Sequence, residues 1–306
     1  MMLALTVLGA VALERLYGGM PPWQQPVTGF TWLVQRVETY GYGPERLPNG
    51  LRLLFGALVL AVMLFIGIVI TGLLVSIPYL GGILAAAVLA LTLRTTEVRA
   101  SAQAIAQALQ NDDLAQAQAR LHPWVEHDCG SLDEEGVSAA TIEKLLIQSH
   151  DALFGALFWF VLAGAPGAVF FRLSLLCAER WGHATPRYRY FGWSAACLAG
   201  ILRYLPIGLT ALGYSLAGDR KTAWRCRRQI GAWSSPGMGA VLAMAAGAMH
   251  LQLGGPIHYF QHRVYRPTLG EGVLPIPQDI PRALRLVDRT LSIGLVAIVI
   301  GAWLAT

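Results

Sequence analysis

Arginine and aromatic side chains crowd into one short stretch between apolar segments, where they could bind a charged ligand. The stretch RYRYFGW holds Arg187, Tyr188, Arg189, Tyr190, Phe191 and Trp193. A guanidinium binds phosphate or carboxylate through paired hydrogen bonds, and aromatic rings offer flat faces. The same composition is typical of a membrane boundary, where arginines reach toward water and rings lie among headgroups. We predict a membrane-edge rim that anchors the chain and can meet an anionic ligand.

Two other groups of side chains have spacings that could bind a metal ion. His258 and His262 in HYFQH have the i, i+4 spacing of a helix, and the run Leu132–Gly136, with Asp128 before it, supplies carboxylates. The histidines lack a nearby carboxylate or cysteine in the sequence, which favours an interfacial polar role. The acidic run is more typical of a helix start capped by Asp133. We therefore assign no metal site.

The composition places these groups in a membrane protein. Of the 306 residues only 13% are charged and 55% are hydrophobic, whereas a soluble domain is roughly 25% charged. A helix needs about 20 apolar residues to cross the hydrocarbon core, where unpaired backbone groups are costly. The predicted spans are residues 55–77, 291–304, 80–93, 153–176, 194–216 and 238–253. The predicted fold class is an all-α, multi-pass transmembrane helical bundle in the cell inner membrane.

Proline and glycine interrupt two of the predicted spans. Pro166 lies between glycines in AGAPGA, and Pro206 precedes Gly208 in the next span. A proline inside a helix removes a hydrogen bond and kinks or splits the helix. Broken helices at membrane depth indicate either a site inside the bundle or a packing kink. The hydropathy shows no inverted repeat, so a transporter is weakly supported.

Two polar segments of opposite charge lie within the single membrane domain that we assign to residues 1–306. Residues 94–151 hold ten acidic and four basic residues, a net charge of −6, and include an alanine- and glutamine-rich stretch. We predict a helical insert outside the membrane there. Residues 217–236 contain DRKTAWRCRR, with five bases and one acid. The positive-inside rule places this basic loop in the cytoplasm.

Neither the N-terminus nor the cysteines indicate a secreted, cross-linked protein. The first 16 residues lack a basic leading region and a cleavage site, so we interpret them as a retained helix. The four cysteines form no CxxC pair. We therefore predict neither a disulfide framework nor a zinc site.

Three blocks of the sequence resemble the CobD/CbiB family of membrane-bound cobalamin-biosynthesis proteins, the adenosylcobinamide-phosphate synthases. The blocks are HATPRYRYFGWSAACLAGILRYLPIGLTAL, LGGPIHYFQHRVYRPTLGEG and PIPQDIPRALRLVDRTLSIG. The resemblance extends over essentially the whole chain. It implies a reaction that joins the carboxylate of adenosylcobyric acid to aminopropanol or its phosphate as an amide, with ATP and Mg²⁺. Such a reaction needs carboxylates for magnesium, cations for phosphate and a dry pocket.

The resemblance also implies the residues of the site. The catalytic candidates, if the chain is active, are Asp128, Glu143 and Asp151. The substrate-binding candidates are Arg172, Arg187, Tyr188, Arg189, Tyr190, Gly254, Gly255 and Pro256. The expected partners are membrane lipid and a corrinoid or other anionic small molecule. We expect no nucleic acid, and a homo-oligomer is left open.

Several polar positions depart from the family pattern. Gln25 stands where the histidine of His-Pro-Val is expected, and Leu175 and Ala178 stand where Asn and Asp are expected. Removing one group that holds transition-state charge commonly costs several kcal/mol. The departures therefore favour a divergent, weakly catalytic or non-catalytic member. The alternative is an active synthase whose missing polar groups are supplied by Gln25, His127 and Gln148.

A second resemblance gives the non-catalytic interpretation a concrete form. The segments ALERLYGGMPPWQQPVTGFTWLVQRVE and IEKLLIQSHDALFGALFWFVLAG resemble AmpE, a related membrane protein regarded as regulatory. We therefore interpret the chain first as an AmpE-like regulatory or signalling member. An active adenosylcobinamide-phosphate synthase is the second interpretation.

Overall fold

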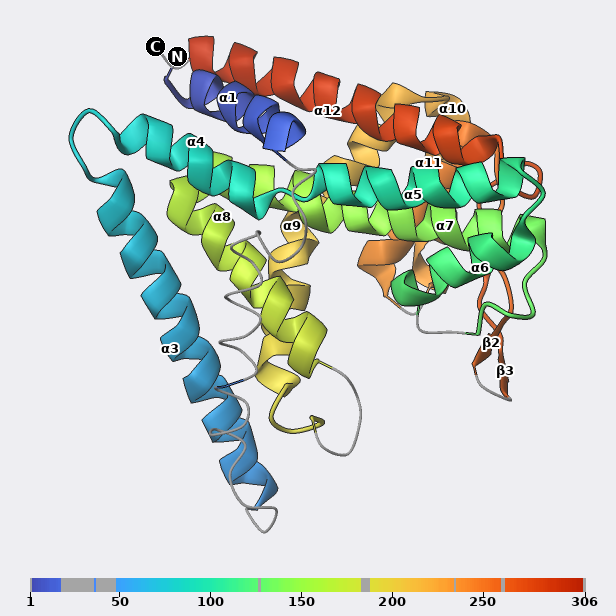
Figure 1. The fold of residues 1–306 in the computed structure, drawn as a ribbon, viewed down its shortest axis with the longest axis horizontal. Coiled ribbons are helices and arrows are strands. Elements are labelled where there is room, and N and C mark those ends of the chain that lie inside the picture. The colour runs from blue at the N-terminus through green and yellow to red at the C-terminus, as the bar shows by residue number, and fades with distance from the viewer. Residues whose placement is uncertain are drawn as a thin grey trace. The chain divides into compact units, whose positions relative to one another are not determined.

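The computed structural model describes residues 2–17, 36, 48–125, 128–182, 188–233, 235–259 and 262–304, and these are almost entirely helical. The longer helices are α1 (Met2–Tyr17), α3 (Asn49–Val75), α4 (Gly81–Thr92), α5 (Thr95–Gln110), α7 (Glu134–Ser149), α8 (Gly155–Trp181), α9 (Trp193–Ala217), α11 (Pro236–Met249) and α12 (Asp279–Leu304). Shorter helical segments are α6 (Leu114–Leu121), η2 (His122–Trp124), η3 (His150–Phe154), α10 (Arg220–Cys226) and η4 (Arg227–Ala232). The predicted helical fold class is confirmed (Figure 1).

Within the part of the chain that the structure describes, four helical stretches are long and apolar enough to cross a membrane. They are Asn49–Val75, Gly81–Gln110, Glu134–Trp181 and Trp193–Ala217. Four of the six predicted spans lie within or overlap them. The predicted insert at residues 94–151 is helical, as α5, α6 and α7, but two of these four helices extend into it. Its position outside the membrane therefore stays a prediction.

Two predicted spans are not among these four helices. Residues 291–304 form only the second half of α12, and their 14 residues of helix would rise about 21 Å, short of a hydrocarbon core of about 30 Å. The first half of α12 carries Arg282, Arg285, Asp288 and Arg289. The predicted span 238–253 ends early, because α11 stops at Met249 and Leu253 lies in a strand.

The described part of the chain also contains four very short strands, which the sequence analysis did not predict. Strand β1 (Leu253–Gly254) pairs antiparallel with β4 (Thr268–Leu269), and β2 (Ile257–Tyr259) pairs antiparallel with β3 (His262–Val264). The helical spacing read into HYFQH is therefore wrong. Successive glycines with positive φ, Gly254 at +88° and Gly255 at +85°, turn the backbone away from a helical path just before it.

The chain divides into two compact units. The first comprises Met1–Arg94 and Asp151–Leu205, and the second comprises Thr95–His150 and Pro206–Ala305. In the first unit α3 packs on α8, and α4 packs on α1 and α8 (Figure 1). Its largest buried side chains include Trp181 and Phe191, whose rings meet edge to face with centroids 5.2 Å apart. Their contact holds the start of α9 against the end of α8.

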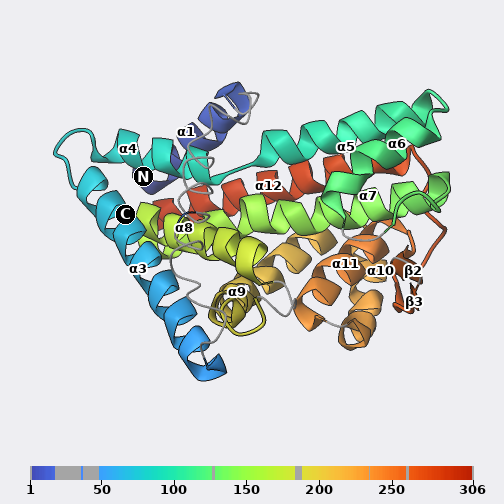
Figure 2. The ribbon, with the colours of Figure 1, turned by 60° about the horizontal axis from the view of Figure 1, so that its bottom comes forward.

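In the second unit α7 is the central helix. It packs against α5, α11 and α12 (Figure 2). Its N-terminus is capped by Asp133, whose carboxylate accepts a hydrogen bond from the Gly136 backbone N–H at 2.8 Å. The predicted helix start at the acidic run is therefore confirmed. Because α7 is covered on several sides, a charged side chain that is buried on it needs a partner inside the protein.

The long helical stretch from Glu134 to Trp181 is irregular at two places. A π-helical turn occupies His150–Phe154, and the helix breaks at Ala163 and Gly164, the latter with φ +67° and ψ −162°. Pro166 follows this break, as the sequence predicts. Single π-helical turns inside α-helices are frequent at functional sites.

Helix α9, by contrast, is not split at Pro206. The helix continues from Trp193 to Ala217. Proline has no N–H, so the carbonyl of Leu202 loses its helical partner. The indole N–H of Trp159 donates to that carbonyl instead, at 3.1 Å. A side chain from α8 thus satisfies the backbone group that the proline leaves open.

We expect Gly164→Ala to destabilise the first unit. The φ and ψ of Gly164 lie in a region that side-chain-bearing residues rarely adopt, at a cost of about 1–3 kcal/mol. Gly200→Ala is the matched control, because a Cβ there meets nothing and alanine is the better helix former. Thermal unfolding of the purified chain in detergent measures both variants. Equal melting temperatures for the two would contradict the expected strain.

Candidate functional site

Glu143, one of the three predicted catalytic carboxylates, lies inside the second unit. It is buried in α7, with a relative exposure of 6%. One carboxylate oxygen accepts a hydrogen bond from the Gly254 N–H at 2.6 Å, and the other accepts from Arg266 Nη1 at 3.0 Å. Glu143 therefore joins the central helix to the chain segment that follows α11.

Arg266 completes this group of side chains. Its Nε donates to the Gly255 carbonyl at 3.2 Å, and its guanidinium carbon lies 5.1 Å from the centre of the Trp233 ring. The side chain of Arg266 is about one-fifth exposed, at 22%. A forked guanidinium over an aromatic face is a rigid arrangement, because hydrogen bonds and ring contact fix it together. We call Glu143, Trp233, Gly254, Gly255 and Arg266 the Glu143 cluster.

A second set of side-chain contacts holds the β1–β4 pair of strands next to Gly270, just after β4. The Gln229 side chain accepts from the Gly270 N–H at 2.6 Å and donates to the Gly270 carbonyl at 3.4 Å. Arg225 forms an exposed ion pair with Glu271 at 3.2 Å. Side chains from α7, α10 and η4 thus fix both strands of the ladder. The base of the segment 253–269 is therefore built as a rigid part of the second unit.

Asp151 forms a separate ion pair in the first unit. Its two carboxylate oxygens accept from Arg203 Nε at 2.9 Å and Nη2 at 2.8 Å. Asp151 lies in the π-helical turn and is 4% exposed. Both residues belong to helices long and apolar enough to cross a membrane. Ionisable side chains in such segments mark functional positions by default.

Asp128 is exposed, and it forms no ion pair with any basic side chain that the structure describes. It lies in the loop before α7, and its carboxylate accepts from the Gly130 N–H at 2.9 Å. Burial, and then the neighbouring Asp128 carboxylate, raise the pKa of the Cys129 thiol. The thiol thus stays protonated at neutral pH and is a poor nucleophile or metal ligand. None of the four cysteines forms a disulfide in the structure.

The three predicted carboxylates do not gather around one metal position. Across the parts of the chain that the structure describes, no three His, Cys, Asp or Glu side chains are grouped so that they could hold a metal ion. Glu143 and Asp151 are each engaged by an arginine. These residues do not fit a protein-built magnesium cage, so we derive no step through one.

The arginine and aromatic stretch is divided between core and surface. Phe191 is buried, Tyr188 packs partly against the same core, and Arg189 and Trp193 are exposed. The Arg189 guanidinium lies 5.9 Å from the Tyr190 ring centre. Arg187 lies outside the described residues, as do Gln25 and His127. The described part of the stretch, residues 188–193, therefore combines a buried side chain with exposed ones, and its role as a membrane-edge rim stays a prediction.

Arg172, a predicted substrate-binding residue, is distant from Asp151. It is buried in α8 at 3% exposure, 21 residues further along the same helical stretch. At about 1.5 Å per residue, with one break between them, the two Cα atoms are separated by roughly 20–30 Å. The two residues cannot contact one small reacting group together.

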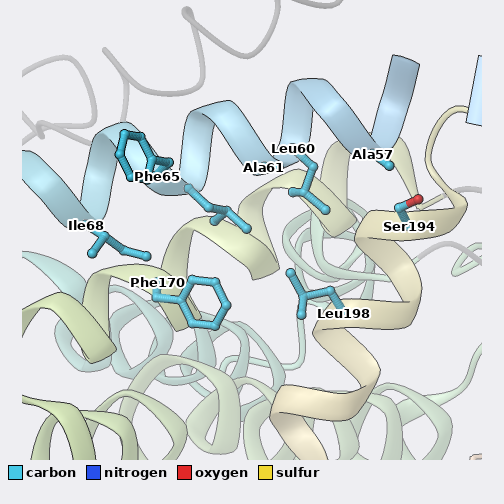
Figure 3. Close-up of a pocket in the computed structure, with 9 residues that line it drawn as sticks. Ala57, Leu60, Ala61, Phe65, Ile68, Phe170, Ser194 and Leu198 are labelled. Atoms are coloured by element: carbon cyan, nitrogen blue, oxygen red, sulfur yellow. The ribbon is translucent and has the colours of Figure 1, made fainter. Parts of the chain in front are cut away.

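An apolar pocket of about 340 Å³ lies in the first unit among α3, α8 and α9 (Figure 3). Leu60, Phe65 and Phe170 line it, with the Ser194 hydroxyl at one side. The described residues around it include no titratable side chain. It therefore lacks the charges that amide formation from a carboxylate requires.

Comparison with known proteins decides the family. The family described as CobD/Cbib protein matches residues 7–287. The chain belongs to the CobD/CbiB family. It is similar to the protein named Cobalamin biosynthesis protein CobD of Chromobacterium violaceum, with 41% identity over 92% of this chain and 90% of that one. The protein of the same name from Stutzerimonas stutzeri is 36% identical over 98% of both chains. No solved structure matches.

Membership of the CobD/CbiB family confirms the predicted resemblance and makes this chain a cobalamin-biosynthesis protein. Within this member, the structure brings Glu143 together with Gly254 and Gly255, all of which the sequence analysis named. It also adds Arg203, Gln229 and Arg266, which that analysis missed. Arg203 and Arg266 lie inside the quoted family blocks. For Arg203, an arginine in an apolar block is the signal that could have revealed it, because such a charge needs a counter-ion.

The basic loop of this CobD/CbiB chain begins with an acid-capped helix, which gives it a pH-dependent stability. The Asp219 carboxylate accepts from the Thr222 hydroxyl at 2.8 Å and from the Lys221 N–H at 2.9 Å. These hydrogen bonds lower the pKa of Asp219 from its ordinary 3.8. A carboxyl whose folded-state pKa is lowered contributes stability above its unfolded-state pKa, and loses it as pH falls through the lowered value.

We therefore expect Asp219→Asn to flatten the acid side of the stability profile. As the pH decreases below about 4, the melting temperature of the wild type should fall more steeply than that of the variant. Thermal unfolding at closely spaced pH values measures the two slopes. Identical slopes below that pH would show that Asp219 titrates as it does in the unfolded chain.

Proposed function

We propose that the chain is an active adenosylcobinamide-phosphate synthase, which joins the carboxyl group of adenosylcobyric acid to aminopropanol or its phosphate as an amide. The observation that carries this proposal is similarity over nearly the full length to relatives named for cobalamin biosynthesis, at up to 41% identity. Those names favour the active synthase over the non-catalytic, AmpE-like interpretation. The ligand expected at the site is a corrinoid with an anionic group.

Amide formation needs an activated carboxyl carbon and an amine that loses a proton as its nitrogen attacks. The family resemblance implies that ATP would activate the carboxyl carbon, and that the activating group would leave as the nitrogen attacks; we assign no residue of this chain to Mg²⁺. Among the three predicted carboxylates, Asp128 alone is exposed, and so it can accept a hydrogen bond from an incoming amine. Glu143 is committed to Gly254 and Arg266, so its role is to position the segment 253–269. We therefore assign Asp128 to contact with the reactants and Glu143 to the positioning of the segment 253–269.

Complementation tests the proposal. A strain unable to make cobinamide should regain it when it expresses the wild-type chain, and Asp128→Asn should abolish this rescue. Asp112→Asn is the matched control, because Asp112 is another exposed acid of the same unit with no assigned role. A wild-type chain that reaches the membrane and is folded but gives no rescue, and no amide from purified substrates with ATP, would overturn the proposal.

We also propose that the chain is a multi-pass protein of the cell inner membrane with its basic loop, residues 217–236, in the cytoplasm. The four apolar helices and the five bases to one acid in DRKTAWRCRR support this orientation. A cysteine introduced at the exposed Arg228 should react with a thiol reagent only when the inner face is accessible. Labelling of intact cells by an impermeant reagent would reverse the orientation.

A further inference from the structure

The segment formed by α10 and η4 presents a strongly basic surface that the proposed reaction does not use. Its buried side chains are Thr222, Ala223 and Cys226, and the segment packs on α11. The outward side carries exposed cations, which are Arg220, Lys221, Arg225, Arg227 and Arg228. We call these five residues together with Trp224 the basic patch.

Little of this positive charge is neutralised within the described structure. Arg225 is paired with Glu271, an exposed contact between side chains that are 66% and 45% exposed. The other four cations form no ion pair with any described acid. Several like charges on one short segment repel one another unless an external anion compensates them. The basic patch is therefore complementary to a surface that carries several negative charges.

Trp224 gives this surface a second property. Its side chain is 52% exposed, and the Arg227 guanidinium carbon lies 4.7 Å from the ring centre. An exposed indole flanked by cations suits the headgroup region of a bilayer, where tryptophan is enriched and cations meet lipid phosphates. A soluble anion such as free phosphate would use the cations but would leave the indole in water.

The position of the basic patch along the chain points to the same partner. Helix α9, which is apolar enough to cross a membrane, ends at Ala217, and α10 begins at Arg220. Two residues separate the end of that helix from the first cation. Clusters of Lys and Arg directly beside a membrane helix attract anionic headgroups, and each such residue strengthens the attraction by about fivefold. We propose that the basic patch is a binding surface for anionic phospholipid headgroups.

Lipid retention by the full-length chain tests this proposal. The protein in a neutral detergent is offered phosphatidylglycerol and phosphatidylcholine together, and native mass spectrometry measures the ratio of the two lipids that it retains. Wild type should prefer phosphatidylglycerol, and Arg227→Gln with Arg228→Gln should reduce that preference by about 25-fold. The matched control is Arg285→Gln with Arg289→Gln, which removes two exposed arginines from α12 of the same unit.

Three results would overturn the proposal. These are an unchanged ratio in the patch variant, an equal loss in the control, and displacement of phosphatidylglycerol by inorganic phosphate of equal charge concentration. The last would assign the patch to a soluble phosphate compound. If the first variant unfolds, Arg220→Gln with Lys221→Gln removes two other patch charges and leaves the Arg227 and Trp224 contact in place. Lipid retention is independent of amide formation, so this test can fail while the synthase proposal stands.

Discussion

Replacing Glu143 by leucine is expected to lower the free energy of unfolding by about 3–5 kcal/mol, since it strands a partly buried arginine without its counter-ion. The variant also removes the acceptor of the Gly254 N–H. The second unit should therefore unfold at a markedly lower temperature. Circular dichroism of the purified chain in detergent measures the shift.

A double variant separates the effect of the two charges from the effect of the volume that the two side chains fill. Glu143→Leu with Arg266→Met replaces both charges by apolar groups, and such replacements are often neutral or stabilising relative to the pair. We expect the double variant to be more stable than Glu143→Leu alone. Lower stability in the double variant, or additive losses, would show that the two side chains are not coupled.

Glu143→Gln then distinguishes an anchoring role from a catalytic one. Glutamine keeps an oxygen that can accept from Gly254 or Arg266 but has no charge. An anchor should lose activity only as far as it loses stability, with a proportionate fall in amide formation. Complete loss of turnover at an unchanged melting temperature would instead make the Glu143 carboxylate catalytic, and Asp128 would no longer be the only reactant-facing acid.

Structural features that depend on residues close together in the sequence could be predicted. An apolar run of sufficient length predicts a spanning helix, so α3, α8 and α9 were found from hydropathy. Asp133 caps α7 through a residue three positions away, and Pro166 marks the broken helix. Each of these signals lies within one or two helical turns.

Features that depend on distant residues could not be predicted in the same way. Glu143 and Arg266 are separated by 123 positions, and Asp151 and Arg203 by 52. No local pattern identifies which arginine neutralises which acid. The mistaken helix at HYFQH has a related cause, because its strands are three residues long, too short to show an alternating pattern. The resemblance to a family supplied the acids but not their partners.

The paired acids also change how the departures from the family pattern are interpreted. Leu175 is fully buried in α8 and Ala178 packs, partly buried, against the core around Trp181, so both apolar replacements lie in packed interior. Glu143 and Asp151 are meanwhile each paired with an arginine, Arg266 and Arg203 respectively. The loss of polar groups at the apolar replacements is therefore compatible with intact ion pairs at Glu143 and Asp151. It also leaves the exposed carboxylate of Asp128 in place.

Replacing Arg203 by methionine should destabilise the first unit as strongly as the Glu143 variant destabilises the second. The change leaves the buried Asp151 carboxylate without its two hydrogen-bond donors, in a helix suited to the membrane, and costs about 3–5 kcal/mol. Arg203→Lys should recover only part of the loss, because an ammonium cannot reproduce the forked contact. Tyr204→Leu is the matched control, since this neighbour is 72% exposed.

The pair also predicts how a second change would rescue the first. Asp151→Asn combined with Arg203→Met removes both charges, so it should unfold at a higher temperature than Arg203→Met alone. Thermal unfolding of the four variants in one detergent gives the comparison. If Arg203→Met were no less stable than Tyr204→Leu, the guanidinium would contribute nothing to holding the π-helical turn. The turn would then be held by its other contact with α9, the 2.9 Å hydrogen bond between His150 Nδ1 and the Thr210 hydroxyl.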